Sequence, residues 1–466
     1  MTIREGRRTS RGCFWVFGAP ALLAGFVACA SIDGLAGGSA DTDAGDGATQ
    51  AEATTDGASV DASVDGDAGC PAPAADPAFL SDAIEIDTNG PAVCAVRQNG
   101  DVVCWGDNTK GQLGTATADG GSPGIDTSAR PLRVGGIPKA SHVAAGYGHA
   151  CATDANGEVW CWGEGTKGQT GSDGALPPPG LSQVITEFGG PLGNVIALAA
   201  GGAFTCALTQ GGGVQCWGDN NLGQLGSRLV PQSPAPVAVP GIGVSTSLTA
   251  GFFHACALGG GTVRCWGGDQ NFELGIPLPD GGGSPPIIYD VMAPARVTAS
   301  SPDTCVIDAK GNVICSGYNQ SGQLGATNMG DKITQPFPIP ELSSGDVRDI
   351  DIGQSHTCGV RTDGTAFCLS GMPYEALGRG PLDASTIDNA ARPVLGPGSG
   401  SAPLFPVDSL KVGGREYGNG GHTCAIVKPA CAPAGQVYCW GSNERGVLGD
   451  GTTTPRDRPV KVLAPL

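Results

Sequence analysis

Most of the chain repeats one alternation of short apolar runs and turn residues. From residue 81 onward, a short apolar run contains a cysteine, a glycine-containing turn follows, and a second short run contains another cysteine, usually followed by Trp-Gly. The fullest copy is AAGGAFTCALTQGGGVQCWGDNNLGQLG, which spans 199–226. Short apolar runs bounded by Gly, Asn and Asp are typical of β-strands joined by tight turns.

Seven copies of this unit follow one another. They begin at Ala92, Ala144, Ala199, Thr249, Asp303, His356 and His422. The first cysteines of successive copies lie 49 to 66 residues apart. A period of about 50 residues made of short strands is typical of propeller blades. We therefore predict an all-β fold over 81–466, a seven-bladed β-propeller with short four-stranded blades.

The spacing of the two cysteines predicts how each hairpin turns. In five copies they are ten residues apart, and a glycine falls six after the first, which fits a three-residue loop with glycine in the left-handed third position. These glycines are Gly100, Gly157, Gly212, Gly311 and Gly364. The fourth copy is one residue shorter and leaves a two-residue Gly260-Gly261 loop. The last copy lengthens the loop with residues 428–435.

The paired cysteines predict cross-strand disulfides. Directly opposed residues of antiparallel strands have Cα atoms close enough for an S–S bond. The seven expected pairs are Cys94–Cys104, Cys151–Cys161, Cys206–Cys216, Cys256–Cys265, Cys305–Cys315, Cys358–Cys368 and Cys424–Cys439. Metal binding is the competing interpretation, but CxxC pairs and Cys/His clusters are absent and pairs spread around a ring cannot converge on one ion.

The combination of AGxxHxC, a glycine turn, CWGxNxxGQLG and the spacing of about 50 residues resembles the repeat of the regulator of chromosome condensation family. The resemblance covers roughly 81–466 and implies a seven-bladed propeller with a central channel. Three copies depart from the pattern: Ser316 replaces tryptophan in the fifth, the sixth has LSGMPYEALG, and the first lacks AGxxH. The eukaryotic namesake exchanges guanine nucleotide and docks on chromatin, whereas a secreted bacterial relative grips an enzyme with one rim.

Residues 1–29 resemble a lipoprotein signal peptide. Four arginines precede an apolar run over 14–28, too short for a comfortable membrane span, and Phe26-Val27-Ala28-Cys29 resembles a lipobox. We expect Cys29 to carry the lipid and hold the protein at the cell envelope, at the outer membrane or surface of a Gram-negative bacterium. The alternative is simple cleavage after Ala30 and a soluble secreted protein.

Residues 30–80 predict a disordered acidic tether. The segment has ten acidic residues and no Lys or Arg, and it cannot bury enough apolar surface to offset its chain entropy. Cys13 is removed with the signal, which leaves Cys70 at the end of the tether and Cys431 in the last hairpin. Since the first and last blades of a closed ring are neighbours, we hypothesise a Cys70–Cys431 clasp.

Two repeated residue types are candidates for a site. Histidines occupy the same position two before the first cysteine, at His149, His254, His356 and His422. Symmetry spreads them around the ring, so we expect structural or rim-lining roles rather than catalysis or metal binding. Tryptophans follow the second cysteine at Trp105, Trp162, Trp217, Trp266 and Trp440, where blade-to-blade packing is expected and a sugar-stacking platform is the minority alternative.

The binding surface is expected on the loops. Loops on a rigid ring commonly carry recognition, so the candidate binding rim consists of the four histidines with Tyr147, Phe252, Phe253 and Tyr417. Long inserts between the copies are further candidates.

No catalytic motif stands out: there is no phosphate loop and no nucleophile elbow. The chain is acidic, with a net charge of −18, which repels the phosphates of nucleic acids. We therefore expect a monomeric, non-enzymatic envelope binding or scaffold protein, with no cofactor and no metal, that presents the propeller to a protein or peptide partner. The alternative is a carbohydrate-active enzyme or glycan binder, and guanine-nucleotide exchange ranks third.

Overall fold

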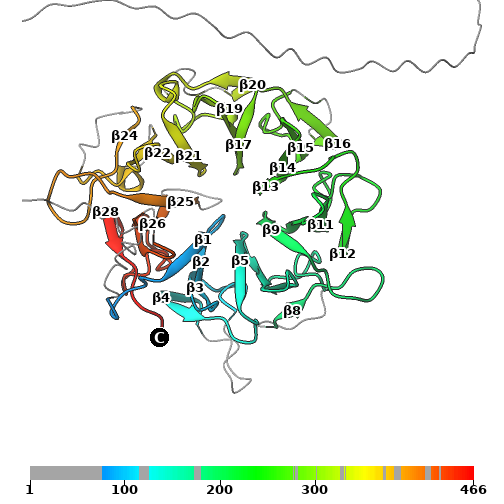
Figure 1. Ribbon diagram of the computed structural model, residues 1–466, viewed down its shortest axis with the longest axis horizontal. Helices are drawn as coiled ribbons and strands as arrows, with labels where there is room; N and C mark the ends of the chain where they lie inside the picture. Colours follow the sequence, from blue (N-terminus) through cyan, green and yellow to red (C-terminus); the bar gives the residue numbers. More distant parts are fainter. Residues whose placement is uncertain are drawn as a thin grey trace, which may run out of the picture. The chain divides into compact units, whose positions relative to one another are not determined.

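The protein is a ring of seven four-stranded antiparallel sheets, which confirms the predicted all-β propeller (Figure 1). The structure is a computed structural model that describes residues 76–114, 125–172, 180–276, 278, 282–300, 302–325, 330, 332–370, 374–381, 390–414, 421–429 and 432–466. Among these residues, no helix has the length and apolar character needed to cross a membrane. The first strand of each blade is nearest the axis and the fourth is outermost.

Each blade is a run of consecutive residues. The first four blades comprise β1 (Ala83–Asp87), β2 (Ala92–Arg97), β3 (Val102–Asp107) and β4 (Thr127–Arg133); β5 (Ala140–Ala145), β6 (His149–Asp154), β7 (Val159–Gly163) and β8 (Ser182–Gln183); β9 (Val195–Ala200), β10 (Phe204–Thr209), β11 (Val214–Asp219) and β12 (Gln232–Ala238); and β13 (Ser247–Ala250), β14 (His254–Gly259), β15 (Thr262–Gly268) and β16 (Gly282–Tyr289).

The last three blades follow the same order and include two short 3₁₀ helices. They comprise β17 (Pro294–Ala299), β18 (Asp303–Asp308), β19 (Val313–Tyr318) and β20 (Lys332–Pro338), then η1 (Pro340–Leu342); β21 (Val347–Ile352), β22 (Thr357–Arg361), β23 (Ala366–Leu369), η2 (Tyr374–Leu377) and β24 (Arg392–Pro393); and β25 (Val407–Gly413), β26 (His422–Val427), β27 (Gln436–Gly441) and β28 (Arg456–Lys461).

All seven predicted disulfides are present, each between the second and third strands of one blade. The Cα atoms of each pair lie 4.0–4.1 Å apart, because the cysteines are directly opposed in the strand register. The hairpin turns are also as predicted: Gly100 has φ 85°, and Gly260 and Gly261 have φ 58° and 72°. So many disulfides indicate that the protein works in an oxidising, exported setting.

The hydrophobic core is divided among the seven interfaces between neighbouring blades. One apolar cluster lies at each interface of the described ring, and five of them contain a buried tryptophan. This confirms the expected packing role of the tryptophans. Each of these five indole Nε1 atoms donates to a backbone carbonyl of the preceding blade, as from Trp217 to Gln169 at 3.0 Å.

The ring closes through hydrogen bonds beside the terminal strands. Leu80 N donates to Val462 O at 2.9 Å, and Ala83 exchanges backbone hydrogen bonds with Gly435 at 2.9 and 3.1 Å. Leu80 is buried. The ordered propeller therefore begins before residue 81, and residues 76–80, which the composition assigned to the tether, belong to it. Cys70 and Cys431 lie outside the described residues, so the clasp stays a prediction.

Candidate functional site

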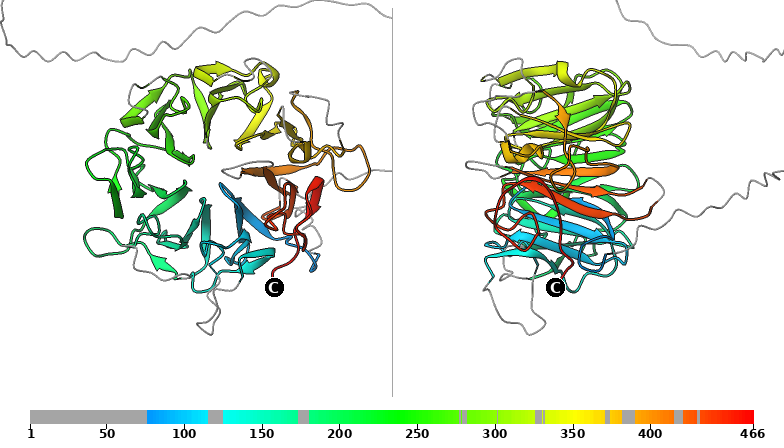
Figure 2. Two further views of the ribbon diagram at one scale, coloured as in Figure 1. Left: turned by 180° about the vertical axis from the view of Figure 1, so that it is seen from behind. Right: turned by 90° about the vertical axis from the view of Figure 1, so that its left-hand side faces the viewer.

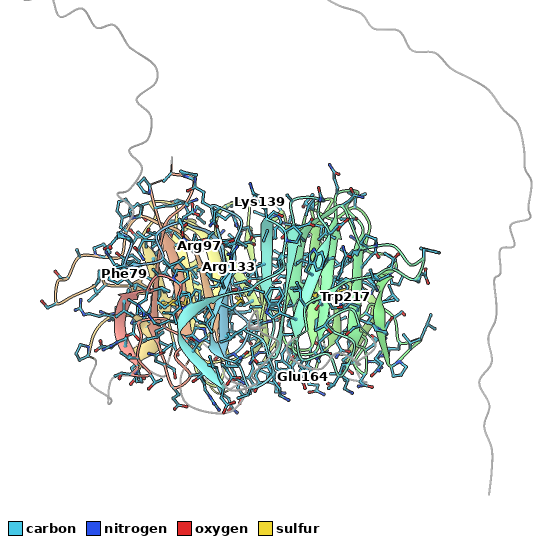
Figure 3. The ribbon with its side chains drawn as sticks, turned by 90° about the horizontal axis from the view of Figure 1, so that it is seen from below. Phe79, Arg97, Arg133, Lys139, Glu164 and Trp217 are labelled. Carbon is cyan, nitrogen blue, oxygen red and sulfur yellow. A yellow bond between two sulfur atoms is a disulfide. The ribbon has the colours of Figure 1, made fainter. Side chains whose placement is uncertain are left out.

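The propeller has two faces with different loops. One, which we call the motif face, carries the connections from first to second strands, such as 146–148, and the GQLG-type loops, such as 108–114. The other, the hairpin face, carries the hairpins between second and third strands and the blade-to-blade connections. Figure 3 shows Glu164 on the motif face and Lys139, in a blade-to-blade connection, on the hairpin face.

The four histidines lie inside the interfaces between blades, so the prediction that they line the binding rim is wrong. His149, His254, His356 and His422 are each at most 4 % exposed. Each Nε2 faces a threonine hydroxyl of the next blade, namely Thr205, Thr304 and Thr423 at 2.8 Å and Thr88 at 3.1 Å. Alternation explains the burial, because a residue two before a buried strand cysteine shares its face.

The hydrogen bonds around His149 define its tautomer. The Thr205 hydroxyl donates its one proton to Gln169 O at 3.0 Å, so it accepts from His149 Nε2–H. His149 Nδ1 is buried without a hydrogen-bond partner, as expected for the unprotonated nitrogen. Burial lowers the pKa of His149 to about 4 and that of His254 to about 3. These imidazoles are neutral structural groups at neutral pH.

The fifth blade shows how a missing tryptophan is replaced. Ser316 stands where five of the other blades carry the indole, and the fully buried phenol of Tyr289, from the preceding blade, fills the space. Tyr289 OH bonds Ser316 Oγ at 2.9 Å and Thr304 O at 3.2 Å. The sequence departure is thus compensated from the neighbouring blade.

The partly exposed aromatic residues of the rim gather in one sector of the motif face. The rings of Tyr147 and Phe252 are 5.3 Å apart, and those of Phe252 and Phe253 are 4.5 Å apart, both edge-on. All three are partly exposed. Phe252 O accepts from Gly202 N at 2.9 Å, so the backbone that carries the rings is fixed against blade 3. Tyr417 lies outside the described residues.

Leu222 extends this apolar sector, and sequence reasoning missed it. A Cβ added to Gly268 would meet Phe253 Cβ at 2.9 Å and Leu222 Cδ1 at 3.1 Å, so the two side chains flank this glycine from adjacent blades. We call Tyr147, Leu222, Phe252 and Phe253 the apolar tract. It runs across blades 2 to 4, with no residue of it contributed by the other blades.

At three other interfaces the equivalent positions form ion pairs between blades. Lys110 contacts Glu164 at 3.1 Å, Lys167 contacts Asp219 at 3.7 Å, and Arg445 contacts Asp107 at 3.6 Å. Leu222 occupies the repeat position of the cation and Gly268 that of the acid. Leucine and glycine therefore replace the two partners of the ion pair where the apolar tract lies, and this pair of changes was the signal in the sequence.

The channel carries carboxylates that hold the blades together. Asp351 Oδ2 accepts from Val412 N at 2.7 Å and its Oδ1 from Thr298 at 2.8 Å. Asp87 accepts from Ala145 N at 2.8 Å and pairs with Lys411 Nζ at 3.3 Å.

Burial raises the pKa of Asp351 to about 6. A cavity of about 60 Å³ beside these groups has room for only a few water molecules. Both carboxylates are thus occupied with interblade contacts, which gives a catalytic pair no support here. Among the described residues, no group of three or more His, Cys, Asp or Glu is placed to hold a metal ion.

Together with the ring of seven sheets, these contacts define a β-propeller with one disulfide inside each blade and with the apolar tract on its motif face. Models of the regulator of chromosome condensation (RCC1) repeat match residues 99–153, 310–360 and 434–466, and a second model of this repeat matches 140–169 and 195–224. The protein is therefore a seven-bladed propeller that contains RCC1 repeats at these segments, as the sequence predicted.

Relatives and solved structures share this architecture. The ultraviolet-B receptor UVR8 of Arabidopsis thaliana is 27 % identical over 392 residues, 78 % of each chain. Probable E3 ubiquitin-protein ligase HERC6 of Homo sapiens is 34 % identical over 169 residues, but these are 35 % of this chain and only 16 % of HERC6. Prp20p from Saccharomyces cerevisiae, described with its binding properties to Gsp1p and histones, superposes with TM-score 0.62 at 20 % identity, covering 83 % of this chain and 87 % of that one. This last likeness shows the shared fold.

Proposed function

We propose that this protein is a non-enzymatic binding or scaffold protein of the cell envelope, anchored by a lipid on Cys29, that presents the apolar tract to a protein or peptide partner. The carrying observation is the tract itself: three aromatic rings and Leu222 lie partly exposed on a fixed backbone. Aromatic side chains on a rigid surface are the usual energetic centres of protein interfaces.

Three further observations support the proposal. The seven disulfides fit an exported protein. The described carboxylates of the channel are engaged in interblade contacts rather than aimed at a ligand. Prp20p, which shares the fold, is described as binding proteins, Gsp1p and histones. HERC6 is a probable ubiquitin ligase, but this chain spans 16 % of its length, so ligase activity receives no support.

Site-specific photocrosslinking tests the proposal in living cells. A benzoylphenylalanine in place of Phe252 is expected to capture one protein or peptide reproducibly from cell envelopes, because this ring lies at the centre of the tract. The same probe in place of Phe337, which is partly exposed on the outer strand β20, is the matched control and should not capture that species. Capture of polysaccharide fragments without protein would establish the glycan-binding alternative instead.

Metabolic labelling tests the anchor separately. Cells fed a palmitate analogue should label the wild-type protein and leave the Cys29→Ala variant unlabelled. A wild-type chain that carries no lipid and is found in the medium would show that the signal is simply cleaved, while leaving the partner experiment intact.

A further inference from the structure

Three successive blade-to-blade connections of the hairpin face each present one strongly exposed apolar side chain. Phe188, between β8 and β9, is 90 % exposed; Val244, between β12 and β13, is 71 % exposed; and Met292, between β16 and β17, is 88 % exposed. All three connections lie on the face opposite the apolar tract, because blade-to-blade connections and second-to-third-strand hairpins share one end of the strands (Figure 2).

Local hydrogen bonds and contacts fix the backbone near each side chain. Around Phe188, Thr186 N donates to Gly190 O at 2.8 Å and Gly189 N to Thr186 O at 2.9 Å, which makes a tight turn. Val244 packs on the hairpin of blade 3, where a Cβ on Gly212 would come within 2.5 Å of its Cγ1. Ala293, directly after Met292, accepts from Ala309 N at 2.9 Å. These three side chains are therefore held out from the surface by loops whose backbone is already ordered, so that burying them against another surface costs little further ordering of the loops.

The N-terminal segment enters the propeller on the same face. Ala83, the first residue of β1, pairs with Gly435 in the hairpin of blade 7, and Phe79 pairs with Leu463 just beyond the end of β28. The 75 residues that precede the described chain, with the proposed lipid site Cys29, thus join the ring on the hairpin face. The chain therefore enters the ring at the same face that carries the three exposed apolar side chains.

We propose that Phe188, Val244 and Met292 insert into the lipid bilayer and seat the propeller with its hairpin face on the membrane. The inference rests on the proposed envelope placement, and it adds an orientation in which the apolar tract faces away from the membrane.

A bilayer fits better than a protein partner, because fluid lipid accepts separate side chains without matching pockets, whereas a protein interface needs one contiguous complementary patch. Glu187 and Asp290 flank two of the tips, so anionic headgroups are not expected to drive the binding.

The expected strength suits a second membrane signal. Partial burial of one Phe or Met side chain contributes roughly a tenfold gain in partitioning, and Val contributes less. Together the tips give a gain of roughly a few hundredfold, less than that of a single acyl chain, which alone binds reversibly. A lipid on Cys29 and the three tips then supply the two signals that stable anchoring takes.

Vesicle cosedimentation of the full mature chain with Cys29→Ala, which carries no lipid, tests the proposal. The protein should bind vesicles of phosphatidylcholine alone, and the added triple substitution Phe188→Ser, Val244→Ser and Met292→Ser should weaken binding by at least about thirtyfold. The matched control is Ile125→Ser with Leu229→Ser, two exposed apolar residues in third-to-fourth-strand loops of the motif face, which should change binding less than about twofold.

A fluorescence measurement guards against unfolding of the triple variant. A tryptophan in place of Phe188 should shift its emission to the blue when vesicles are added, whereas one in place of Leu229 should not.

Binding of the unlipidated chain no stronger than that of the triple variant overturns the proposal. So does binding that requires phosphatidylglycerol and is lost at high salt, since that would be electrostatic adsorption. Neither outcome alters capture at Phe252, so the two proposals fail separately.

Discussion

The interface between blades 2 and 3 and the interface between blades 3 and 4 use the same repeat positions for opposite chemistry. Between blades 2 and 3, His149 donates to Thr205 in the interior and Lys167 pairs with Asp219 at the surface. Between blades 3 and 4, the buried Phe204 replaces the histidine and Ala255 replaces the threonine, while Leu222 and Gly268 replace the ion pair. The second interface is therefore apolar from the interior to the motif face.

At five of the seven interfaces the two partners of the interior pair change together; between blades 5 and 6, Asp303 stands at the position of the histidine and Thr357 at that of the threonine. Histidines of blades 2, 4 and 6 are each followed by a threonine in the next blade, and Phe204 and Ala92 are each followed by an alanine, Ala255 and Ala150. At the closing interface, His422 finds its hydroxyl on Thr88, from another position of blade 1.

Each interface is thus satisfied on its own, as expected when repeats contact only their neighbours. One interface can become a binding surface without disturbing the other six.

The largest effect is expected from mixing the two interior chemistries. Phe204→His places an imidazole opposite Ala255, which offers it no hydrogen-bond partner, and it removes a buried phenyl ring. We expect a loss of about 3 kcal/mol in the free energy of unfolding, measured by guanidinium denaturation with the disulfides intact.

Adding Ala255→Thr to Phe204→His rebuilds the pair seen at His149, since Gln224 O can accept the new hydroxyl as Gln169 O does from Thr205. This second change should recover at least about 1 kcal/mol. A double variant no more stable than the single one would show that the pairing is incidental.

The next effect concerns the surface of the same two interfaces. Phe252→Ala with Phe253→Ala removes the two phenyl rings of the apolar tract and should weaken binding of the captured partner at least about hundredfold. Lys167→Ala, at the polar interface, should change this affinity by less than about threefold. Titration of the purified partner by calorimetry gives both values, and equal losses in the two variants would place the binding site elsewhere.

The two kinds of interior, one with a buried histidine and one with a buried phenylalanine, should also differ in how the free energy of unfolding depends on pH. His254→Phe with Thr304→Ala copies the Phe204/Ala255 pair into the next interface and removes one buried histidine. Burial lowers the pKa of His254 to about 3, whereas an exposed imidazole in the unfolded chain titrates near 6.5. Below pH 6.5 the unfolded chain binds the extra proton, so this histidine costs stability as the pH falls toward 3.

The double variant should therefore lose stability with acidification less steeply than the wild type, by about 1.4 kcal/mol per pH unit between about pH 6 and 4. Guanidinium unfolding at several pH values measures the two slopes. Asp351 and Glu273, whose pKa burial raises to about 6 and about 7, act in the opposite direction in both proteins and cancel in the difference. Parallel slopes would mean that His254 is hydrated in the native state.

Local geometry decided which features the sequence could predict. The number of residues from Cys94 to Cys104 and the position of Gly100 between them determine the type of turn. The turn then determines the register of the two strands, and this register places the two sulfur atoms opposite each other. The burial of His149 could also have been predicted, because it shares a strand face with Cys151. The incorrect expectation of exposure arose because His149 directly follows the loop 146–148 and begins the strand.

The apolar tract depends on contacts that the sequence does not display. Leu222 and Phe253 belong to different blades and meet over Gly268 only when the ring places blades 3 and 4 side by side. The partner of Ser316 was hidden for the same reason, since Tyr289 comes from the preceding blade. Features within one repeat were predictable, and features between repeats needed the ring.

The smallest expected effect tests why the two surfaces differ. Lys167→Leu copies Leu222 into the polar interface and removes the ion pair with Asp219, in which the lysine side chain is 45 % exposed and the charged atoms are 3.7 Å apart. Solvent screens such a pair, so the free energy of unfolding should change by less than about 0.5 kcal/mol. A near-neutral result means that an ion pair and a leucine at this position contribute about equally to stability, and differ only in the kind of surface that they expose. The apolar tract then needs a partner to explain it, whereas a loss above about 1 kcal/mol would make the ion pairs structural and weaken that reasoning.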